Sequence, residues 1–286
     1  MQRESGKAKR LVFVVVWLLA LFGFPSVATN GYYIHLANMI GISVILALGL
    51  NLIFGYTGQI SLGHAGFYAL GAYLSTILEV KAGWPFIPAA AAAILATALV
   101  ALLIGLPILR LRGHYLAMAT LAFGLIISTL ATELVGITGG HDGISVPARK
   151  LLGNWLAENM YYLIMPSAVL AYLAVSNLVS SRIGRAIRAV REDEVAARAM
   201  GIDATYYKAL MFVYSAAFAG VAGVLYAHLT RVITPDAFSL NGSILILTMV
   251  VIGGLGNKIG AVLGAAFIVL LPEFLYSLQD YNVLVY

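Results

Sequence analysis

A few polar side chains interrupt stretches that are otherwise apolar enough to cross a membrane, and these are the first candidates for chemistry. One group surrounds a glycine-rich turn and comprises Asn51, Gln59, Ser61 and His64, and a single carboxylate, Glu133, follows in a later stretch. Polar groups at membrane depth are costly and therefore often functional. The group at the turn either caps broken backbone or lines a route for a zwitterion. Glu133 either joins that route or reaches the interface, where water solvates it. We take these five residues as candidates for a translocation path.

Motifs for catalysis are missing from the sequence. It contains no G-x-x-x-x-G-K-[ST] loop, so this chain does not itself cradle ATP phosphates. It also lacks H-E-x-x-H and G-x-S-x-G, and without cysteine it has no thiolate nucleophile and no cysteine-based metal site. We predict no catalytic residues, no metal site and no cofactor bound by this chain. Any active uptake then draws its energy from partner ATPases.

A second candidate region is the charged segment 180–208. Ser180 or Ser181 can cap a short helix there, and Gly201 is placed to end it. On one side of that helix fall the small apolar residues Ala196, Ala197 and Met200, framed by charged side chains. Such a strip suits docking into a partner's groove, whereas the alternative is a solvated basic loop that only enforces membrane topology. The residues predicted to make this contact are Arg191, Glu192, Asp193, Glu194, Ala196, Ala197, Met200 and Gly201.

The elements that carry these residues are predicted to be membrane-spanning helices. Hydrophobic residues make up 62% of the 286 positions and charged residues 10%, against about 25% charged in soluble domains. Helices also satisfy their own backbone hydrogen bonds, as a bilayer requires. We predict an all-α polytopic transmembrane bundle forming one permease domain, 1–286, with about nine apolar segments. These are Leu11–Ala28 (a retained helix rather than a signal peptide), Ile34–Phe54, Ser61–Leu78, Phe86–Leu109, Tyr115–Ile137, Tyr161–Val179, Ala209–Leu229, Ile244–Leu255 and Ile259–Tyr276.

The basic residues indicate the orientation of the bundle. With the N-terminus in the cytoplasm, 13 of the 17 lysines and arginines fall on cytoplasmic segments, as the positive-inside rule expects. The net charge of +5 is therefore a sign of topology, and we expect no nucleic-acid partner. The long loops are then the external loop 138–160 and the cytoplasmic loop 180–208.

Glycines punctuate the third predicted span and the last two. They are Gly58, Gly63 and Gly66, followed much later by Gly256, Gly260 and Gly264. Small residues spaced by four let helix backbones approach closely in lipid. Paired glycine-interrupted segments in two halves of a transporter also mark broken helices near its pathway. Because Asn51–Leu74 and Thr248–Leu271 form such a pair, we predict broken or re-entrant helices and an inverted repeat.

Several blocks of the sequence resemble one known family. Glu194-Val195-Ala196-Ala197 followed by Gly201 resembles the E-A-A-x-x-x-G loop of bacterial ABC importer permeases, with the glutamate one position early. The blocks 51–66, 112–122, 138–143 and 253–260 resemble the branched-chain amino-acid permeases of this class, of the LivM type. That family usually has a further apolar span after the one matched by Ile259–Tyr276.

The resemblance implies a function and a set of partners. The segment Glu194–Gly201 would be the coupling helix, seated in a cleft of an ATPase subunit. The expected partners are a homologous permease subunit, giving a heterodimer, two ABC ATPases that bind ATP with Mg, and an external binding protein. The substrates would be leucine, isoleucine and valine, with urea or short amides as the alternative. An independent secondary transporter is the other reading, and transport in liposomes that hold this protein alone, with an ion gradient and no ATPase, would favour it. The expected location is the bacterial cytoplasmic (inner) membrane. Thr138–Gly143 would form a turn or touch the binding protein.

Overall fold

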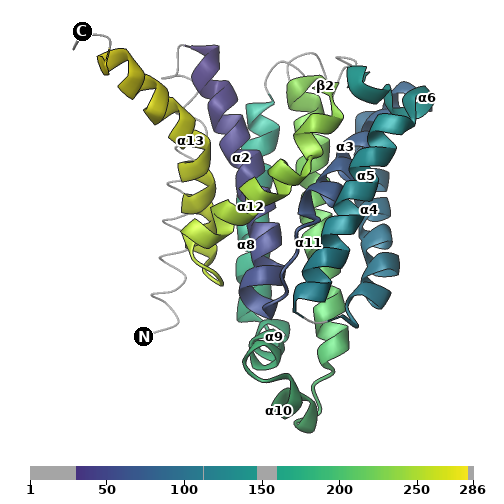
Figure 1. Cartoon of the computed structure of the whole chain (residues 1–286), viewed down its shortest axis with the longest axis vertical. Helices are drawn as coiled ribbons and strands as arrows, with labels where there is room; N and C mark the ends of the chain where they lie inside the picture. Colours follow the sequence, from purple (N-terminus) through teal and green to yellow (C-terminus); the bar gives the residue numbers. More distant parts are fainter. Residues whose placement is uncertain (1–29, 112, 147–159, 283–286) are drawn as a thin grey trace.

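The computed structural model describes residues 30–111, 113–146 and 160–282, and it shows a bundle of long helices (Figure 1). Six helices in the described part are long and apolar enough to cross a membrane. The predicted span Leu11–Ala28 lies outside the described residues. The six are α2 with its π-helical continuation η1 (Gly31–Asn51 and Leu52–Tyr56), α4 (Phe86–Ile108), α5 (His114–Glu133), α8 (Tyr161–Ser180), α11 (Ala204–Thr230) and α13 (Lys258–Asn282).

Two further apolar helices are shorter. α3 (His64–Val80) has 17 residues and α12 (Leu240–Gly253) has 14. At 1.5 Å per residue they reach about 26 and 21 Å, less than a hydrocarbon core of about 30 Å. The polytopic helical fold is thus confirmed, while the count of nine spanning segments is not. The long helices also differ from the predicted spans at their ends, because α11 starts at Ala204 and α5 stops at Glu133.

The helix α2 is the most deeply buried of the candidate spans, with α11, α13 and α8 packed beside it. Its apolar residues lie in one continuous core with those of α3, α8 and α11. Where α3 crosses α11, a methyl group added to Gly71 would overlap the backbone of Gly220, and one added to Gly223 would overlap that of Tyr68. The close crossing of α3 and α11 therefore depends on these glycines.

The glycines singled out from the sequence occupy two kinds of position. Gly63 and Gly66 face α5, and Gly260 and Gly264 face α12, each so closely that a methyl group would meet the neighbouring helix. The other two, Gly58 and Gly256, lie in turns with positive φ of 70° and 77°. The first group serves close helix packing, and the second allows the chain to turn at the ends of η1 and α12.

The two ends of the bundle carry different structures. At one end α9 (Arg182–Glu192) and α10 (Glu194–Ala199) project beyond the long helices (Figure 1). At the other end lie α6 (Val135–Thr138), the 3-10 helix η2 (Gly140–Asp142), and the strands β1 (Ile144–Ser145) and β2 (Val232–Ile233). A second 3-10 helix, η3 (Pro235–Phe238), leads from β2 to α12 and packs against α3 and α5.

The described part of the predicted external loop is ordered by a short β-pairing. β1 and β2 are antiparallel, with Ile144 opposite Ile233. Gly139 and Gly143, with φ of 76° and 75°, flank η2 and form a tight turn. The turn interpretation of Thr138–Gly143 is confirmed, and the pairing ties this turn to the end of α11.

Candidate functional site

The projecting segment consists of two short helices, where the sequence predicted one. Ser181 caps α9 by accepting hydrogen bonds from the backbone N–H groups of Ile183 and Gly184, at 3.1 and 3.4 Å. The chain then breaks at Asp193, which has extended backbone (φ −152°, ψ 110°). An aspartate favours such a break because its carboxylate can replace the missing helical acceptors of the next helix.

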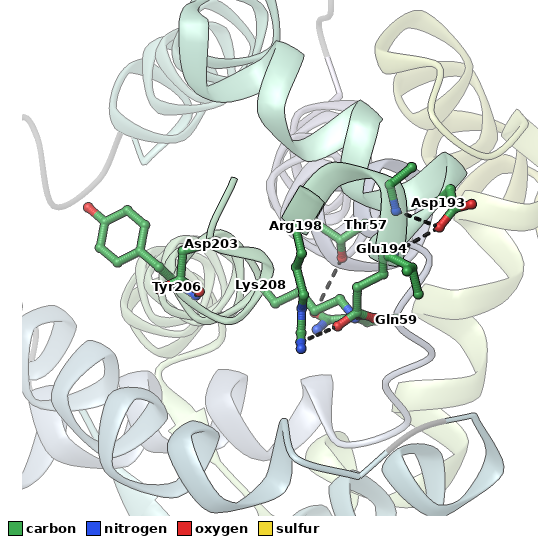
Figure 2. Close-up of polar contacts among 10 residues, drawn as sticks. Thr57, Gln59, Asp193, Glu194, Arg198, Asp203, Tyr206 and Lys208 are labelled. Carbon is green, nitrogen blue, oxygen red and sulfur yellow. Dashed lines mark hydrogen bonds and ion pairs between the residues drawn. The ribbon is translucent and has the colours of Figure 1, made fainter. Parts of the chain in front are cut away.

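Asp193 and Gly201 set the two ends of α10. The Asp193 carboxylate accepts hydrogen bonds from the N–H groups of Val195 and Ala196 at 2.8 and 3.0 Å (Figure 2). Gly201 follows the last turn with φ of 81°, a conformation that glycine adopts without the strain of a Cβ. The predicted end of the helix at Gly201 is therefore confirmed, and α10 is a single capped unit.

Glu194 fastens this unit to the bundle. Its two carboxylate oxygens bind Arg198 Nη2 at 2.7 Å, within α10, and Lys208 Nζ at 2.6 Å, on α11 (Figure 2). Exposed ion pairs each contribute about 0–1 kcal/mol, but Glu194 and Lys208 are partly buried. Glu194 therefore has partners within its own chain, and its position orients α10 against the start of α11.

The apolar residues of α10 divide between an inner and an outer side. Ala197 is 4% exposed and packs with Val190 and Ala204 in a small cluster. Val195 and Met200 are 77% and 82% exposed. The prediction that Ala197 shares the outward strip with Ala196 and Met200 is wrong, because Ala197 holds α10 to α9 and α11. The outer strip, as we use the term below, consists of Val195, Ala196, Ala199 and Met200.

The polar residues at the glycine-rich turn are all buried, yet they do not form one cluster. Asn51 hydrogen-bonds the backbone between α12 and α13, and the hydroxyl of Thr57 lies 3.2 Å from Gln59 Oε1 (Figure 2). Among the described residues the buried Ser61 hydroxyl has no hydrogen-bond partner, while the buried His64 ring lies at the backbone of Leu46. Asn51 thus matches the reading in which these residues cap broken backbone. Their role as a translocation path stays a prediction.

The carboxylates near the opposite end behave differently from each other. Glu133 is exposed at the last residue of α5, in keeping with an interfacial position. Glu79, at the end of α3, is 1% exposed and lies 3.0 Å from His228 Nε2 on α11. The His228 ring also packs against Phe86 in a T-shaped arrangement, with centroids 4.6 Å apart. His228 is itself buried, at 9% exposed.

Comparison with known proteins places the chain in a family. The family described as "Branched-chain amino acid transport system / permease component" matches residues 32–286, nearly the whole chain. The chain belongs to this family. The LivM permease proteins of the high-affinity branched-chain amino acid transport systems of Salmonella typhimurium strain LT2 and Escherichia coli strain K12 are each 33% identical over 98% of this chain and 72% of their own length.

A second branch of the permease family is also related to the chain. The LivH permease protein of Escherichia coli strain K12 is 29% identical over 77% of this chain and 77% of its own length. No solved structure matches the chain. The resemblance drawn from the sequence motifs is confirmed by these matches, which show a polytopic membrane protein of the permease family.

An apolar cavity of about 230 Å³ lies between α3, α5 and α6 of this permease-family chain. Its walls are almost entirely aliphatic and aromatic, with Thr138 among the lining residues. The residues that line it include Leu70, Tyr73, Leu74, Ile127, Leu130 and Leu134. None of the five predicted pathway residues lines this cavity. No local pattern in the sequence predicts this cavity, because its walls come from ordinary apolar positions on separate helices.

Proposed function

We propose that this chain is the membrane-spanning permease subunit of a binding-protein-dependent ABC importer for leucine, isoleucine and valine. Membership of the permease family and the names of its LivM and LivH relatives support this substrate class over urea or short amides. The observation that carries the mechanism is the outer strip of α10. It is a capped, apolar surface that projects from the bundle and is available to a second protein.

The proposed assembly contains parts that this chain lacks. A homologous permease subunit would complete the path, and two ABC ATPases carrying ATP and Mg would supply the energy. An external binding protein would deliver the substrate, and the chain itself would not be an enzyme. The protein would lie in the bacterial cytoplasmic membrane with its N-terminus inside. The arginines of α9 support this orientation, because positive residues favour the cytoplasmic side.

In this mechanism the ATPases bind α10, and their movement drives alternating access. The outer strip would enter a cleft of the ATPase, flanked by Arg198 and other charges that set its orientation. Closure of the two ATPases on ATP would displace α10 together with α9, since Ala197 and Val190 pack against each other. A secondary transporter would need a mobile ion-coupling group, whereas Glu79, the buried carboxylate in the described part of the chain, is already held by His228.

The outer strip gives a direct test of this function. Met200→Arg and Val195→Arg place a charge where an apolar contact is expected, without disturbing a buried position. We expect each to reduce co-purification of the ATPases and leucine uptake about tenfold or more. Val135→Arg is the matched control, because Val135 is also exposed but lies at the opposite end of the bundle. ATPase binding that survives both α10 variants, or leucine uptake by this chain alone in liposomes under an ion gradient, would contradict the proposal.

A further inference from the structure

Three segments that are far apart in the sequence meet near Arg191: the end of α2, the turn between α12 and α13, and α9 itself. The side chain of Asn51, at the end of α2, is completely buried. Its Oδ1 accepts a hydrogen bond from the N–H of Gly256 at 2.9 Å, and its Nδ2 donates to the carbonyl oxygen of Asn257 at 3.1 Å. Asn51 therefore holds the turn between α12 and α13 through one donor and one acceptor of its backbone.

Arg191 of α9 reaches the same turn. Its Cγ lies 3.7 Å from the position that a Cβ on Gly58 would occupy, and its Nη1 lies 3.0 Å from that position on Gly256. The arginine side chain thus extends across the turn after η1 and the turn after α12. Glycine at both positions leaves room for it. The contact joins the projecting segment to the α12–α13 turn.

The α12–α13 turn is suited to movement. α12 has 14 residues, too few to span the bilayer as a regular helix, and the turn that follows has Gly254 and Gly256 with positive φ. At its other end the turn is fastened by Lys258, whose Nζ lies 2.6 Å from Ser176 Oγ on α8. Hinges usually lie in such short connections at the ends of elements.

We propose that Arg191 and Asn51 are positioning residues that transmit movement of α9 and α10 to the α12–α13 turn. This turn is then the part of the chain that moves when the cytoplasmic end of the path opens and closes. Arg191 follows α9 and presses on the turn, and Asn51 keeps the turn in register with the end of α2. The inference rests on the proposed function, because it takes the initial displacement of α10 from an ATPase.

Spin labels can follow the two movements separately, because the chain has no native cysteine. Arg185→Cys on α9 and Leu255→Cys in the turn are each paired with Leu99→Cys on α4, and all three positions are exposed. Distances are measured by double electron–electron resonance in the assembled transporter, with and without ATP. We expect both distances to change with ATP. In Asn51→Ala and in Arg191→Ala, the 185–99 change should persist while the 255–99 change is lost.

Function provides the second readout. In both variants, leucine uptake per ATP hydrolysed should fall about tenfold. Asn38→Ala is the matched control, since Asn38 is a buried asparagine on the same helix, away from the turn. Arg191→Ala is the second variant because Arg191 is exposed, so its replacement should not disturb folding as the loss of a buried side chain could. An unchanged 255–99 response in either variant overturns the inference. If ATP leaves the 185–99 distance unchanged in the labelled protein that keeps Asn51 and Arg191, the proposed function is overturned instead.

Discussion

The side-chain oxygen of Asn51 accepts a hydrogen bond from the backbone N–H of Gly256, 205 residues further along the chain. The Asn51 side chain is completely buried, so a lost partner would leave its amide unsatisfied and costly. The break at the end of α2 and the break between α12 and α13 are therefore one structural unit. The two glycine-interrupted segments found in the sequence lie against each other here, whereas the inverted repeat stays a prediction.

Substitution of Gly256 should reveal how tightly this unit is packed. A Cβ in Gly256→Ala would lie 3.0 Å from Arg191 Nη1 and 3.1 Å from the carbonyl oxygen of Gly55, in addition to the strain of a positive φ. We expect a loss of about 2–4 kcal/mol of unfolding free energy, measured by thermal unfolding in detergent. Gly83 has a similar φ of 72° and open space around it, so Gly83→Ala should lose only about 1–2 kcal/mol of unfolding free energy. Equal losses would mean that crowding at Gly256 is unimportant.

Substitutions at Ala197, which is buried, and Ala199, which is exposed, distinguish effects on the folding of α10 from effects on its docking. Ala197→Arg forces a charge into the cluster with Val190 and Ala204, so α9 and α10 should lose their mutual packing. We expect amide hydrogen exchange in residues 186–199 to accelerate about tenfold or more, as measured by mass spectrometry. Ala199→Arg changes an exposed position and should leave this exchange as it is. If residues 186–199 stay protected from hydrogen exchange in Ala197→Arg, the cluster of Ala197, Val190 and Ala204 is not needed for the packing of α9 and α10.

The buried pair of Glu79 and His228 should be a structural clamp between α3 and α11. Glu79→Ala removes one partner of the pair and leaves a buried polar ring, with an expected cost of about 3 kcal/mol in unfolding free energy. Glu79→Gln keeps an acceptor for His228 and should cost less. Glu133→Ala is the control carboxylate, exposed and at the end of α5, with an effect expected within about 0.5 kcal/mol. Similar effects at the two glutamates would refute the clamp.

The crossing of α3 and α11 gives a fourth prediction. Gly71→Ala pushes a methyl group into the backbone of Gly220, so the two helices must separate along part of their contact. We expect a decrease of about 1–3 kcal/mol in unfolding free energy, measured in detergent. Gly136→Ala adds the same methyl group where no atom lies within 4 Å and should be neutral. A stable Gly71→Ala protein would place the helix contact elsewhere.

The long apolar helices could be predicted from the sequence because their signal is local. Composition and run length define α4 and α8 almost to the residue, since a lipid-exposed helix needs only an unbroken apolar stretch. The caps at Ser181 and Gly201 were likewise predictable, because each depends on its own residue type. The family motifs added the identity of the permease, which composition alone does not provide.

Other features depend on distant residues and escaped prediction. Glu79 lies just past the predicted span Ser61–Leu78, and its burial is evident only once His228, 149 residues later, faces it. The orientation of α10 depends on the break at Asp193, which rotates Ala197 inward and Val195 outward. A single continuous helix from Ser181 would have placed these side chains differently. Tertiary contacts of this kind leave no periodic pattern in the sequence.

The separation between Asn51 and its backbone partners also has a consequence for biosynthesis. The ribosome releases α2 long before it has made the turn that Asn51 holds. During that interval the amide sits in the nascent bundle without its final contacts. Formation of the α12–α13 turn therefore acts as a closing step of assembly, and a chain truncated before Gly256 leaves the Asn51 amide without the backbone partners it has in the complete fold.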